Sequence, residues 1–382
     1  MRIGIFTDAY VPQIGGVSTA SQLIKKHLNA LGHEAYVITT TEKETPVEEN
    51  VIRIPSIPFF SEKRMGGNFD PRISQEVKGL KLDLVHTQTE YGVGLMGKSL
   101  AKQQGIPHIH TFHTLYDDWM YGQLGENGFS HFVVGAMNKY LRYFLKDCDE
   151  IIVPTPKAKA FVEGYELDKT LTVLPTGIEL DKFFQAGENQ KRRQALRAEY
   201  GIPLDAFTLV YVGRISQEKK IDVVLEHLFP LLRQGEEIYF LIVGSGPKLD
   251  EYRHWVESEG FGKYIKLIGS VAIDQVQDYY SVGDVFACAS ESETQGLTYI
   301  EALATGLPIL VYPDACLDQV FLDGVNGLSF TNAQEFADAL LELKNTPDQY
   351  QRLSEGAKQS SQKYSVDHFI NSLLEVYERQ LV

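Results

Sequence analysis

The sequence predicts an α/β protein with two doubly wound domains that face a cleft. Short β-rich runs alternate with helical patterns throughout, the alternation restarts in the second half, and 382 residues are too many for one ordinary core. We expect a first domain over 1–175, a second over 176–364, and a C-terminal helix over 365–382 that returns to the first domain.

The elements of the first domain begin with a strand expected over residues 2–6, followed by a helix with one apolar face. Further strands are expected at 35–39, 51–54, 82–86, 108–111, 151–154 and 171–174. In an open parallel sheet, ligands bind at the carboxyl ends of the strands, so site residues are expected just after these runs.

The second domain repeats this pattern. Its strands are expected at 207–212, 238–243, 265–268, 285–287 and 308–311, with helical patterns at 222–233 and 247–257. The polar stretch 185–200 lacks a strand signal and is assigned to the junction, whereas an apolar stripe at Phe369, Leu373 and Tyr377 predicts the last helix.

Composition excludes several classes of protein. The net charge is −15: residues 1–170 hold 18 Lys and Arg against 20 Asp and Glu, so about −13 falls on 171–382, which argues against nucleic acid as a partner. Three distant cysteines favour a reducing cytoplasm over a disulfide framework. No run of about 18 apolar residues predicts a membrane span, and the N-terminus lacks the apolar core of a signal peptide.

Two glycine-containing turns are candidate phosphate sites. Gly15 and Gly16 precede the first helix, where glycines let helix-start N–H groups approach an anion, although a simple tight turn explains them equally well. Arg214 and Lys219 follow the strand 207–212, so they are placed to grip a diphosphate; the alternative is two solvated surface cations.

The segment SESETQGLTYIEALATG (290–306) is the third candidate. Glu293 lies in the expected strand-to-helix loop and Glu301 lies inside the helix, whose first N–H groups belong to Gly296, Leu297 and Thr298. Carboxylates beside an anion site suit the hydroxyl groups of a sugar, while the alternative is that Glu293 or Thr294 only caps the helix.

Other motifs point away from cofactors. Gly244-Ser-Gly246-Pro lacks the third glycine of a dinucleotide fingerprint. Asp147-Cys-Asp149 precedes the strand 151–154 and so lies at the wrong end of the sheet for a metal site. We therefore expect no metal ligand set and no tightly bound cofactor.

The chain resembles the retaining GT-B glycosyltransferases of family 4. The segments that carry the resemblance, in order, are PQIGGV, HTFHT (110–114), LPTGIEL (174–180), VGRISQEKK (212–220), VGSGP (243–247) and SETQGLTYIEALATG (292–306). The family implies two Rossmann-like domains and a nucleotide-sugar donor held mainly by the second, with Gly244 near it.

The resemblance also implies roles for single residues. Arg214 and Lys219 match residues that neutralise the donor diphosphate, Glu301 matches the carboxylate on the ribose, and Glu293 the one facing the sugar. Gly296, Leu297 and Thr298 match backbone donors at the helix start, and Gly16 matches a glycine near the phosphates. His113 matches a histidine at the reaction centre; without the family match, a core histidine would be the simpler reading.

More narrowly, FTDAYVPQIGGVST, HTQTEYGVG and HTFHTLYDD are similar to bacterial diacylglycerol glucosyltransferases. These enzymes transfer glucose from UDP-glucose to diacylglycerol with retention of configuration. Their products are α-monoglucosyl lipids, which serve as glycolipid anchors. The expected partners are therefore UDP-glucose, diacylglycerol and an anionic membrane surface, and the expected place is the inner face of the cell membrane.

Two segments are candidates for contact with lipid. Lys139, Arg142 and Lys146 share one face of a helical pattern over 129–146, which fits an anionic bilayer, or a helix that packs on the sheet with its cations in water. The second segment is an aromatic and basic loop, which is equally consistent with an ordinary surface loop. Its candidate residues are Phe59, Phe60, Lys63 and Arg64.

Three other functions remain open at this point. The same chemistry on a glycosyl-diacylglycerol or polysaccharide precursor, or with UDP-galactose, fits the same residues. A nucleotide-sugar-binding module without catalysis would bind UDP-sugar, transfer nothing and tolerate loss of His113.

Overall fold

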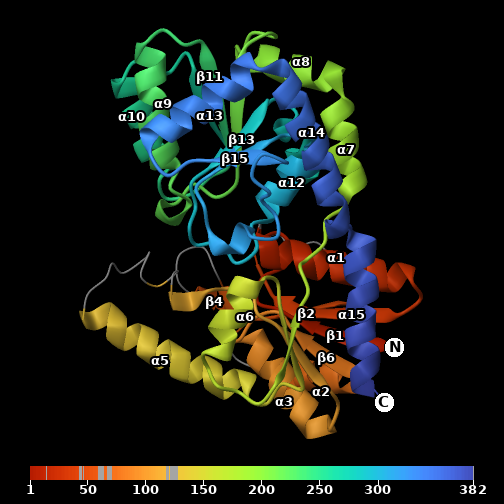
Figure 1. Ribbon diagram of the computed structural model, residues 1–382. Coiled ribbons are helices and arrows are strands. Elements are labelled where there is room, and N and C mark those ends of the chain that lie inside the picture. Colours follow the sequence, from red (N-terminus) through yellow and green to blue (C-terminus); the bar gives the residue numbers. More distant parts are fainter. Residues whose placement is uncertain are drawn as a thin grey trace. The chain divides into compact units, whose positions relative to one another are not determined.

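Figure 1 shows the computed structural model of the chain. The structure describes residues 1–13, 15–42, 45, 47–58, 64–66, 71–117, 120 and 128–381. The chain forms two compact units, one made of Met1–Gly177 with Val366–Val382 and the other of Ile178–Ser365.

The first unit contains a seven-stranded parallel sheet in the order β3-β2-β1-β6-β7-β8-β9. Its strands are buried runs, as expected for a sheet covered on both faces. They are β1 (Arg2–Phe6), β2 (Glu34–Thr40), β3 (Val51–Ile54), β6 (Leu84–Thr87), β7 (His108–Thr111), β8 (Glu150–Val153) and β9 (Thr170–Val173). A separate antiparallel pair joins β4 (Ser56–Pro58) to β5 (Arg64–Gly66).

Helices cover both faces of this sheet. One face packs against α1 and α15, and the other against α2 and α3. The bounds are α1 (Gly16–Ala30), α2 (Pro71–Gly79), α3 (Val93–Gln104), α5 (Gly128–Leu145), α6 (Pro156–Glu163) and α15 (Val366–Leu381). Helix α15 buries Phe369, Leu373 and Tyr377 in the first unit's core, and each of these side chains contributes about 2 kcal/mol.

The second unit contains a six-stranded parallel sheet in the order β12-β11-β10-β13-β14-β15. Its strands are β10 (Phe207–Val212), β11 (Ile238–Val243), β12 (Ile265–Gly269), β13 (Val285–Cys288), β14 (Ile309–Val311) and β15 (Gly327–Ser329). The sequence analysis did not predict β15, a three-residue strand that has too few residues to show a β pattern.

Figure 1 shows α9, α10 and α13 on one side of this second sheet and α7, α12 and α14 on the other. The α-helices are α7 (Leu180–Glu188), α8 (Gln190–Glu199), α9 (Ile221–Arg233), α10 (Leu249–Ser258), α11 (Val276–Tyr280), α12 (Leu297–Thr305), α13 (Ala333–Asn345) and α14 (Pro347–Ser361). The stretch 185–200, assigned from sequence to the junction, is helical in α7 and α8 and belongs to the second unit. Both doubly wound sheets predicted from the sequence are thus present.

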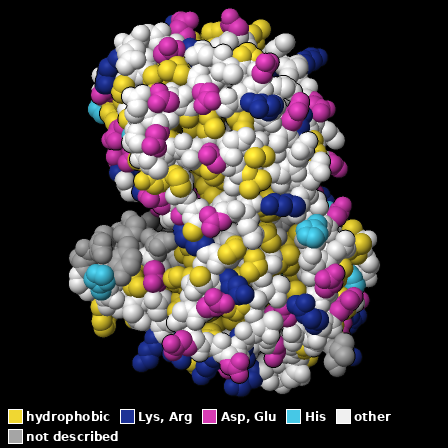
Figure 2. Space-filling model, in the orientation of Figure 1, with side chains coloured by type: hydrophobic (Ala, Val, Ile, Leu, Met, Phe, Trp, Pro, Cys, Tyr) yellow, Lys and Arg dark blue, Asp and Glu magenta, His cyan; other side chains and the backbone are white. Residues whose placement is uncertain are grey.

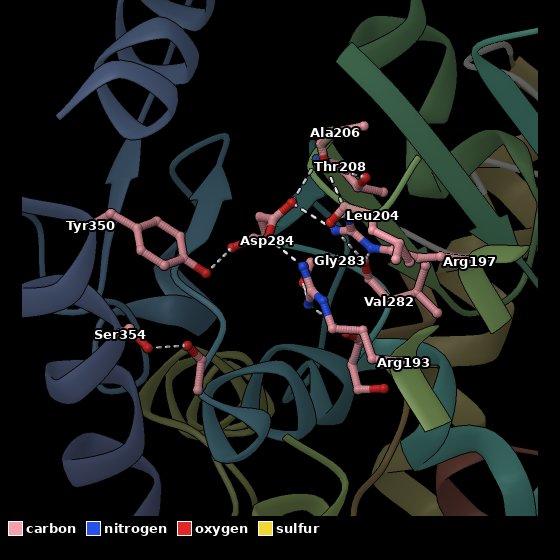
Figure 3. Close-up of polar contacts among 12 residues, drawn as sticks. Arg193, Arg197, Leu204, Ala206, Thr208, Val282, Gly283, Asp284, Tyr350 and Ser354 are labelled. Atoms are coloured by element: carbon pink, nitrogen blue, oxygen red, sulfur yellow. Dashed lines mark hydrogen bonds and ion pairs between the residues drawn. The ribbon is translucent and has the colours of Figure 1, made fainter. Parts of the chain in front are cut away.

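A buried ion network fixes α8 to the amino end of β13 (Figure 3). Arg193 Nη2 lies 2.6 Å from Asp284 Oδ1, and Arg197 Nη2 lies 2.9 Å from Asp284 Oδ2. The Arg197 side chain is 1% exposed and also donates to the carbonyl oxygens of Val282 and Ala206. Because all these charges have partners, the network anchors the helix rather than offering charge to a ligand.

A polar cavity of about 290 Å³ adjoins this network. Asp284, Gly306 and Leu307 line it just before β13 and β14, so it opens at the amino edge of the second sheet. Tyr350 and Ser354, also in its wall, donate to the backbone carbonyls of Asp284 and Gly306. The cavity therefore lies at the opposite edge from the residues that the sequence singled out.

Candidate active site

In the second unit, Lys219 and Glu293 meet although 74 residues separate them. β10 and β13 are hydrogen-bonded neighbours, so the loops at their carboxyl ends lie side by side. Ser290 and Ser292 donate to the carbonyl oxygen of Glu218, which ties the two loops together. Lys219 Nζ then lies 2.6 Å from Glu293 Oε1, with the two side chains 21% and 12% exposed.

This ion pair changes the acidity of Lys219. Burial by itself lowers the pKa of the ammonium group, but Glu293, with smaller effects of Cys288 and Glu218, outweighs burial and raises the pKa above its ordinary value. Lys219 is therefore held as a cation beside a carboxylate. Both residues were predicted from the sequence as site residues, but their pairing was not predicted.

Glycines bring backbone close to backbone in the neighbouring loops. A Cβ on Gly244 would lie 1.8 Å from the carbonyl oxygen of Gly213, and Gly244 has a φ of 139°. Both features require glycine at this position. The contact fixes the loop after β10 to the loop after β11, and Arg214, directly after Gly213, has an exposed side chain in this region.

Helix α12 begins at this same edge of the sheet. Its N-cap is Gly296 in the left-handed region (φ 70°), which has no side chain to cap the helix. Leu297 and Thr298 begin the helix, so their N–H groups lie at its positive end. The carboxylate of Glu293 accepts a hydrogen bond from the ammonium group of Lys219. The alternative in which Glu293 only caps the helix did not predict this contact.

Glu301 lies in the middle of α12 and accepts a hydrogen bond of 2.6 Å from the hydroxyl of Tyr280. Burial raises the pKa of Glu301, while Tyr280 and Lys182 oppose that rise. Tyr280 was not a predicted site residue. No motif marks it, because its role depends on α11 packing against α12.

In the first unit, residues from three adjacent strands gather at one edge of the sheet. Asp8 follows β1, Gln88 follows β6 and His113 follows β7, and β6 pairs with both other strands. Gly16 begins α1, the helix that follows β1, and it is exposed. Parallel strands present their carboxyl ends on one edge, so these residues share that edge.

His113 is partly exposed, and its Nε2 lies 2.6 Å from Oε1 of Gln88. Burial, followed by the neighbouring His110, lowers the pKa of His113 to about 4, although Glu90 opposes the change. The imidazole is therefore neutral near pH 7. Gln88, which the sequence analysis did not single out, is 1% exposed.

Asp8 is 1% exposed and fixes the surrounding loops, because it accepts hydrogen bonds from the N–H groups of Gly66 and Val93 and from the Thr89 hydroxyl. Burial raises the pKa of Asp8 from 3.8 to about 6, against these hydrogen bonds. The folded state therefore holds the proton more tightly than the unfolded state does.

Asp8 gives a prediction about pH. Its contribution to stability is complete below about pH 4 and is lost as the pH rises through about 6, and two pKa units correspond to about 3 kcal/mol. We expect the unfolding free energy of the wild type relative to Asp8→Asn to fall by up to about 3 kcal/mol between pH 4 and 7. Urea denaturation followed by circular dichroism measures this difference; a constant value would contradict the assignment.

The lipid-contact candidates are only partly described. Phe59, Phe60 and Lys63 lie outside the described residues. Arg64 is in β5, where its guanidinium donates to the hydroxyl and the carbonyl oxygen of Ser56, so it has a structural role in the β4–β5 pair.

The other candidates are Lys139 and Arg142 in α5 and Lys146, which directly follows it, and all three are exposed. The buried residues of α5 are Ser130, Val134, Leu141, Phe144 and Leu145. Phe132, by contrast, is 75% exposed.

Among the residues that the structure describes, no group of three or more His, Cys, Asp or Glu side chains is placed to hold a metal ion. Asp147 instead pairs with Lys98, and Asp149 accepts from the N–H of His108, at the amino ends of the strands. In the same part of the chain, no helix is both long and apolar enough to cross a membrane.

Two family models match the chain. The model described as Glycosyltransferase Family 4 matches residues 14–182, and the model described as Glycosyl transferases group 1 matches residues 192–360. Together they cover most of both units.

Two relatives are named alpha-monoglucosyldiacylglycerol synthase. The one from Streptococcus pneumoniae is 36% identical, and the match covers 91% of this chain and 79% of the relative. The one from Acholeplasma laidlawii is 35% identical, and the match covers 99% of this chain and 96% of the relative.

Solved structures show the same fold. Anabaena HepE, in complex with UDP and glucose, has a TM-score of 0.78 at 16% identity, over 99% of this chain and all of that one. Sucrose-phosphate synthase from Thermosynechococcus elongatus has a TM-score of 0.76 at 18% identity, over 99% of this chain and 98% of that one. These likenesses confirm the fold class that the sequence predicts.

Proposed function

Because this chain belongs to the glycosyltransferases of family 4, we propose that it transfers glucose from UDP-glucose to diacylglycerol with retention of configuration. The product is an α-monoglucosyldiacylglycerol. The observation that carries this proposal is the likeness, at 35% identity and over nearly the full length of both chains, to a synthase of that name.

We assign the donor diphosphate to the edge of the second sheet where Lys219 lies. The Lys219 ammonium, the exposed Arg214 and the amide groups at the start of α12 supply positive charge to the leaving UDP. Because Gly244 has no side chain, the backbone of the loop after β11 lies close to the backbone of Gly213 in the loop after β10. In this assignment Glu293 serves two purposes: it holds Lys219 before the donor binds, and it accepts from sugar hydroxyls afterwards.

We assign the ribose to Glu301. A carboxylate accepts hydrogen bonds from both hydroxyls of a vicinal diol, and Tyr280 occupies only one of its lone pairs. The rise in the pKa of Glu301 fits a carboxylate that gains from further hydrogen-bond donors.

We propose that Gly16 and His113 of the first unit are the residues that contact the donor sugar. Gly16, at the start of α1, offers backbone N–H groups, and His113 offers a neutral imidazole. In the proposed reaction the acceptor hydroxyl attacks on the face that the UDP leaves, and its proton passes to a phosphate oxygen of the donor. No side chain is needed as a covalent nucleophile.

We propose that α5 contacts an anionic membrane surface, where the lipid acceptor resides. Its exposed residues Phe129, Phe132, Lys139 and Tyr143 are spaced to share one side of the helix, and the exposed Lys146 directly follows it. Figure 2 shows Lys and Arg side chains along the border of the first unit in the region of α5. Both features are those of a helix that lies on a bilayer surface.

This gives a second prediction. Replacing Lys139, Arg142 and Lys146 together by Gln removes about 1 kcal/mol of surface attraction per residue, so binding to vesicles of anionic phospholipid is expected to fall by up to about 100-fold. Co-sedimentation measures it. The matched control replaces three exposed lysines of the second unit, Lys191, Lys263 and Lys363, and is expected to bind like the wild type. Equal losses in both variants would contradict a specific role of α5.

The proposed function is tested by product analysis. Purified protein is incubated with detergent-dispersed diacylglycerol and labelled UDP-glucose or UDP-galactose, and the lipid is analysed by mass spectrometry and by the anomeric proton coupling in NMR. We expect a monoglucosyl lipid with the α configuration. Transfer only to a glycosylated lipid or a soluble sugar would replace the acceptor, and binding of UDP-sugar without transfer would favour a binding module.

A further inference from the structure

A line of hydrogen bonds in the first unit joins His113 to the C-terminal helix. Nε2 of His113 lies 2.6 Å from Oε1 of Gln88, and Nε2 of Gln88 lies 2.9 Å from Nε2 of His86. Nδ1 of His86 lies 2.7 Å from the hydroxyl of Tyr377 in α15. The line crosses from β7 through β6 to α15, residues that are far apart in the sequence.

The three residues behind His113 are buried. His86 and Tyr377 are 0% exposed and Gln88 is 1% exposed. Burying an imidazole and a primary amide costs free energy that apolar side chains would avoid, unless every polar atom has a partner. The Thr111 hydroxyl supplies a further partner, 2.7 Å from Nε2 of His86. A saturated buried network of this kind holds its members in one geometry.

The amide of Gln88 gives the line a direction. An amide oxygen can only accept, so the Nε2 of His113 that faces Oε1 must carry a hydrogen. The amide nitrogen can only donate, and it lies 2.9 Å from Nε2 of His86 and 3.3 Å from Nδ1. We take the nearer Nε2 as the acceptor, which leaves the hydrogen of His86 on Nδ1, toward Tyr377. A neutral His113 then has its lone pair on Nδ1.

We propose that Gln88 is a positioning residue that fixes the ring of His113 and selects the tautomer with hydrogen on Nε2, with His86 and Tyr377 holding Gln88 in place. In this tautomer Nδ1 is a hydrogen-bond acceptor, which suits a hydroxyl group of the donor sugar rather than a phosphate oxygen. This inference rests on the proposed role of His113 in sugar binding.

The pKa of His113 is low, about 4, so its ring is neutral near pH 7. Only a neutral imidazole has two tautomers, and Gln88 can then favour one of them. Without Gln88, the ring is free to rotate about χ1 and χ2 and to exchange tautomers. A displacement of about 1 Å at a reacting centre can cost about 100-fold in rate.

The first experiment reads the tautomer directly and needs no activity. Protein labelled with ¹⁵N-histidine is examined by two-dimensional NMR at pH 7, where protonated and unprotonated ring nitrogens have well separated shifts, and His113→Asn identifies the resonances. We expect hydrogen on Nε2 of His113 in the wild type and a mixture of tautomers in Gln88→Met. Hydrogen on Nδ1 in the wild type would overturn the proposal.

The second experiment uses kinetics. Gln88→Met is expected to lower kcat/KM for the UDP-sugar by about 100-fold. Tyr377→Phe, which leaves Gln88 in place, is expected to lower it about tenfold. The control is Tyr364→Phe, another buried tyrosine, which donates to the carbonyl oxygen of Gln319 in the second unit, and it is expected to retain wild-type kinetics. Unchanged kinetics in Gln88→Met would overturn the proposal.

The two hypotheses fail in different ways. If His113→Asn keeps full activity, the proposed role of His113 in the reaction is wrong, whatever the NMR spectrum shows. If His113→Asn is inactive but Gln88→Met retains both activity and a single tautomer, the role of His113 stands and the positioning by Gln88 is wrong.

Discussion

Lys219→Gln is expected to lower kcat by about 100- to 1,000-fold, because it removes a positive charge from the place where we locate the leaving diphosphate. The glutamine retains a donor for Glu293, so the fold is expected to survive with a loss of about 1–3 kcal/mol in unfolding free energy from the weakened pair. Turnover of UDP-glucose at saturating lipid measures the effect. If a folded variant kept activity near that of the wild type, the assignment of Lys219 to the phosphate site would be wrong.

The adjacent residue provides a matched control. Lys220 also pairs with a carboxylate, that of Glu291, but the two side chains are 42% and 39% exposed. Exposed ion pairs contribute little, so Lys220→Gln is expected to stay within about twofold of the wild-type kcat and about 1 kcal/mol of its stability. A similar loss in both variants would indicate a general effect of charge on the loop.

Glu301→Gln is expected to raise the KM for the UDP-sugar about 100-fold with a smaller effect on kcat. Hydrogen bonds to a charged acceptor contribute about 1.5–3 kcal/mol each, and an amide can accept from only one of two ribose hydroxyls in the same geometry. Isothermal titration with UDP measures the same loss without catalysis. Undiminished UDP affinity would contradict the ribose assignment.

Tyr280→Phe tests whether Glu301 needs its hydrogen bond from Tyr280 in order to bind the donor. It removes the 2.6 Å hydrogen bond to Glu301 but leaves the carboxylate in α12. We expect a rise in KM of about tenfold or less. A loss equal to that of Glu301→Gln would mean that the position of the carboxylate, rather than its charge, determines binding.

The sequence predicted the sheets well because buried parallel strands are apolar along their whole length. The predicted bounds of β10 and β11 are the observed ones. Each strand has six residues, of which at least five are buried, so the apolar run is continuous. The three-residue strand β15 was missed. The 185–200 stretch was assigned to a junction although it is helical, because α8 buries only Leu196 and Arg197 and therefore shows no apolar stripe.

The candidate site was predictable only where a motif carried it. Lys219, Glu293 and Glu301 lie in segments that resemble a known family, and their places at strand ends follow from the alternation of strands and helices. Their partners follow from tertiary packing: Tyr280 reaches Glu301 from α11, and Gln88 reaches His113 from the loop after β6. No local pattern in the sequence distinguishes these two residues from other buried polar ones.

The return of α15 to the first unit has a consequence for synthesis. The core of that unit includes Phe369, Leu373 and Tyr377, so on the ribosome it stays incomplete until the final helix has emerged. Residues 178–365 are all translated before that point, and the second unit can therefore finish folding while the first still exposes the apolar groove for α15. Translation that stops before residue 366 would leave one folded unit attached to one that chaperones must still hold.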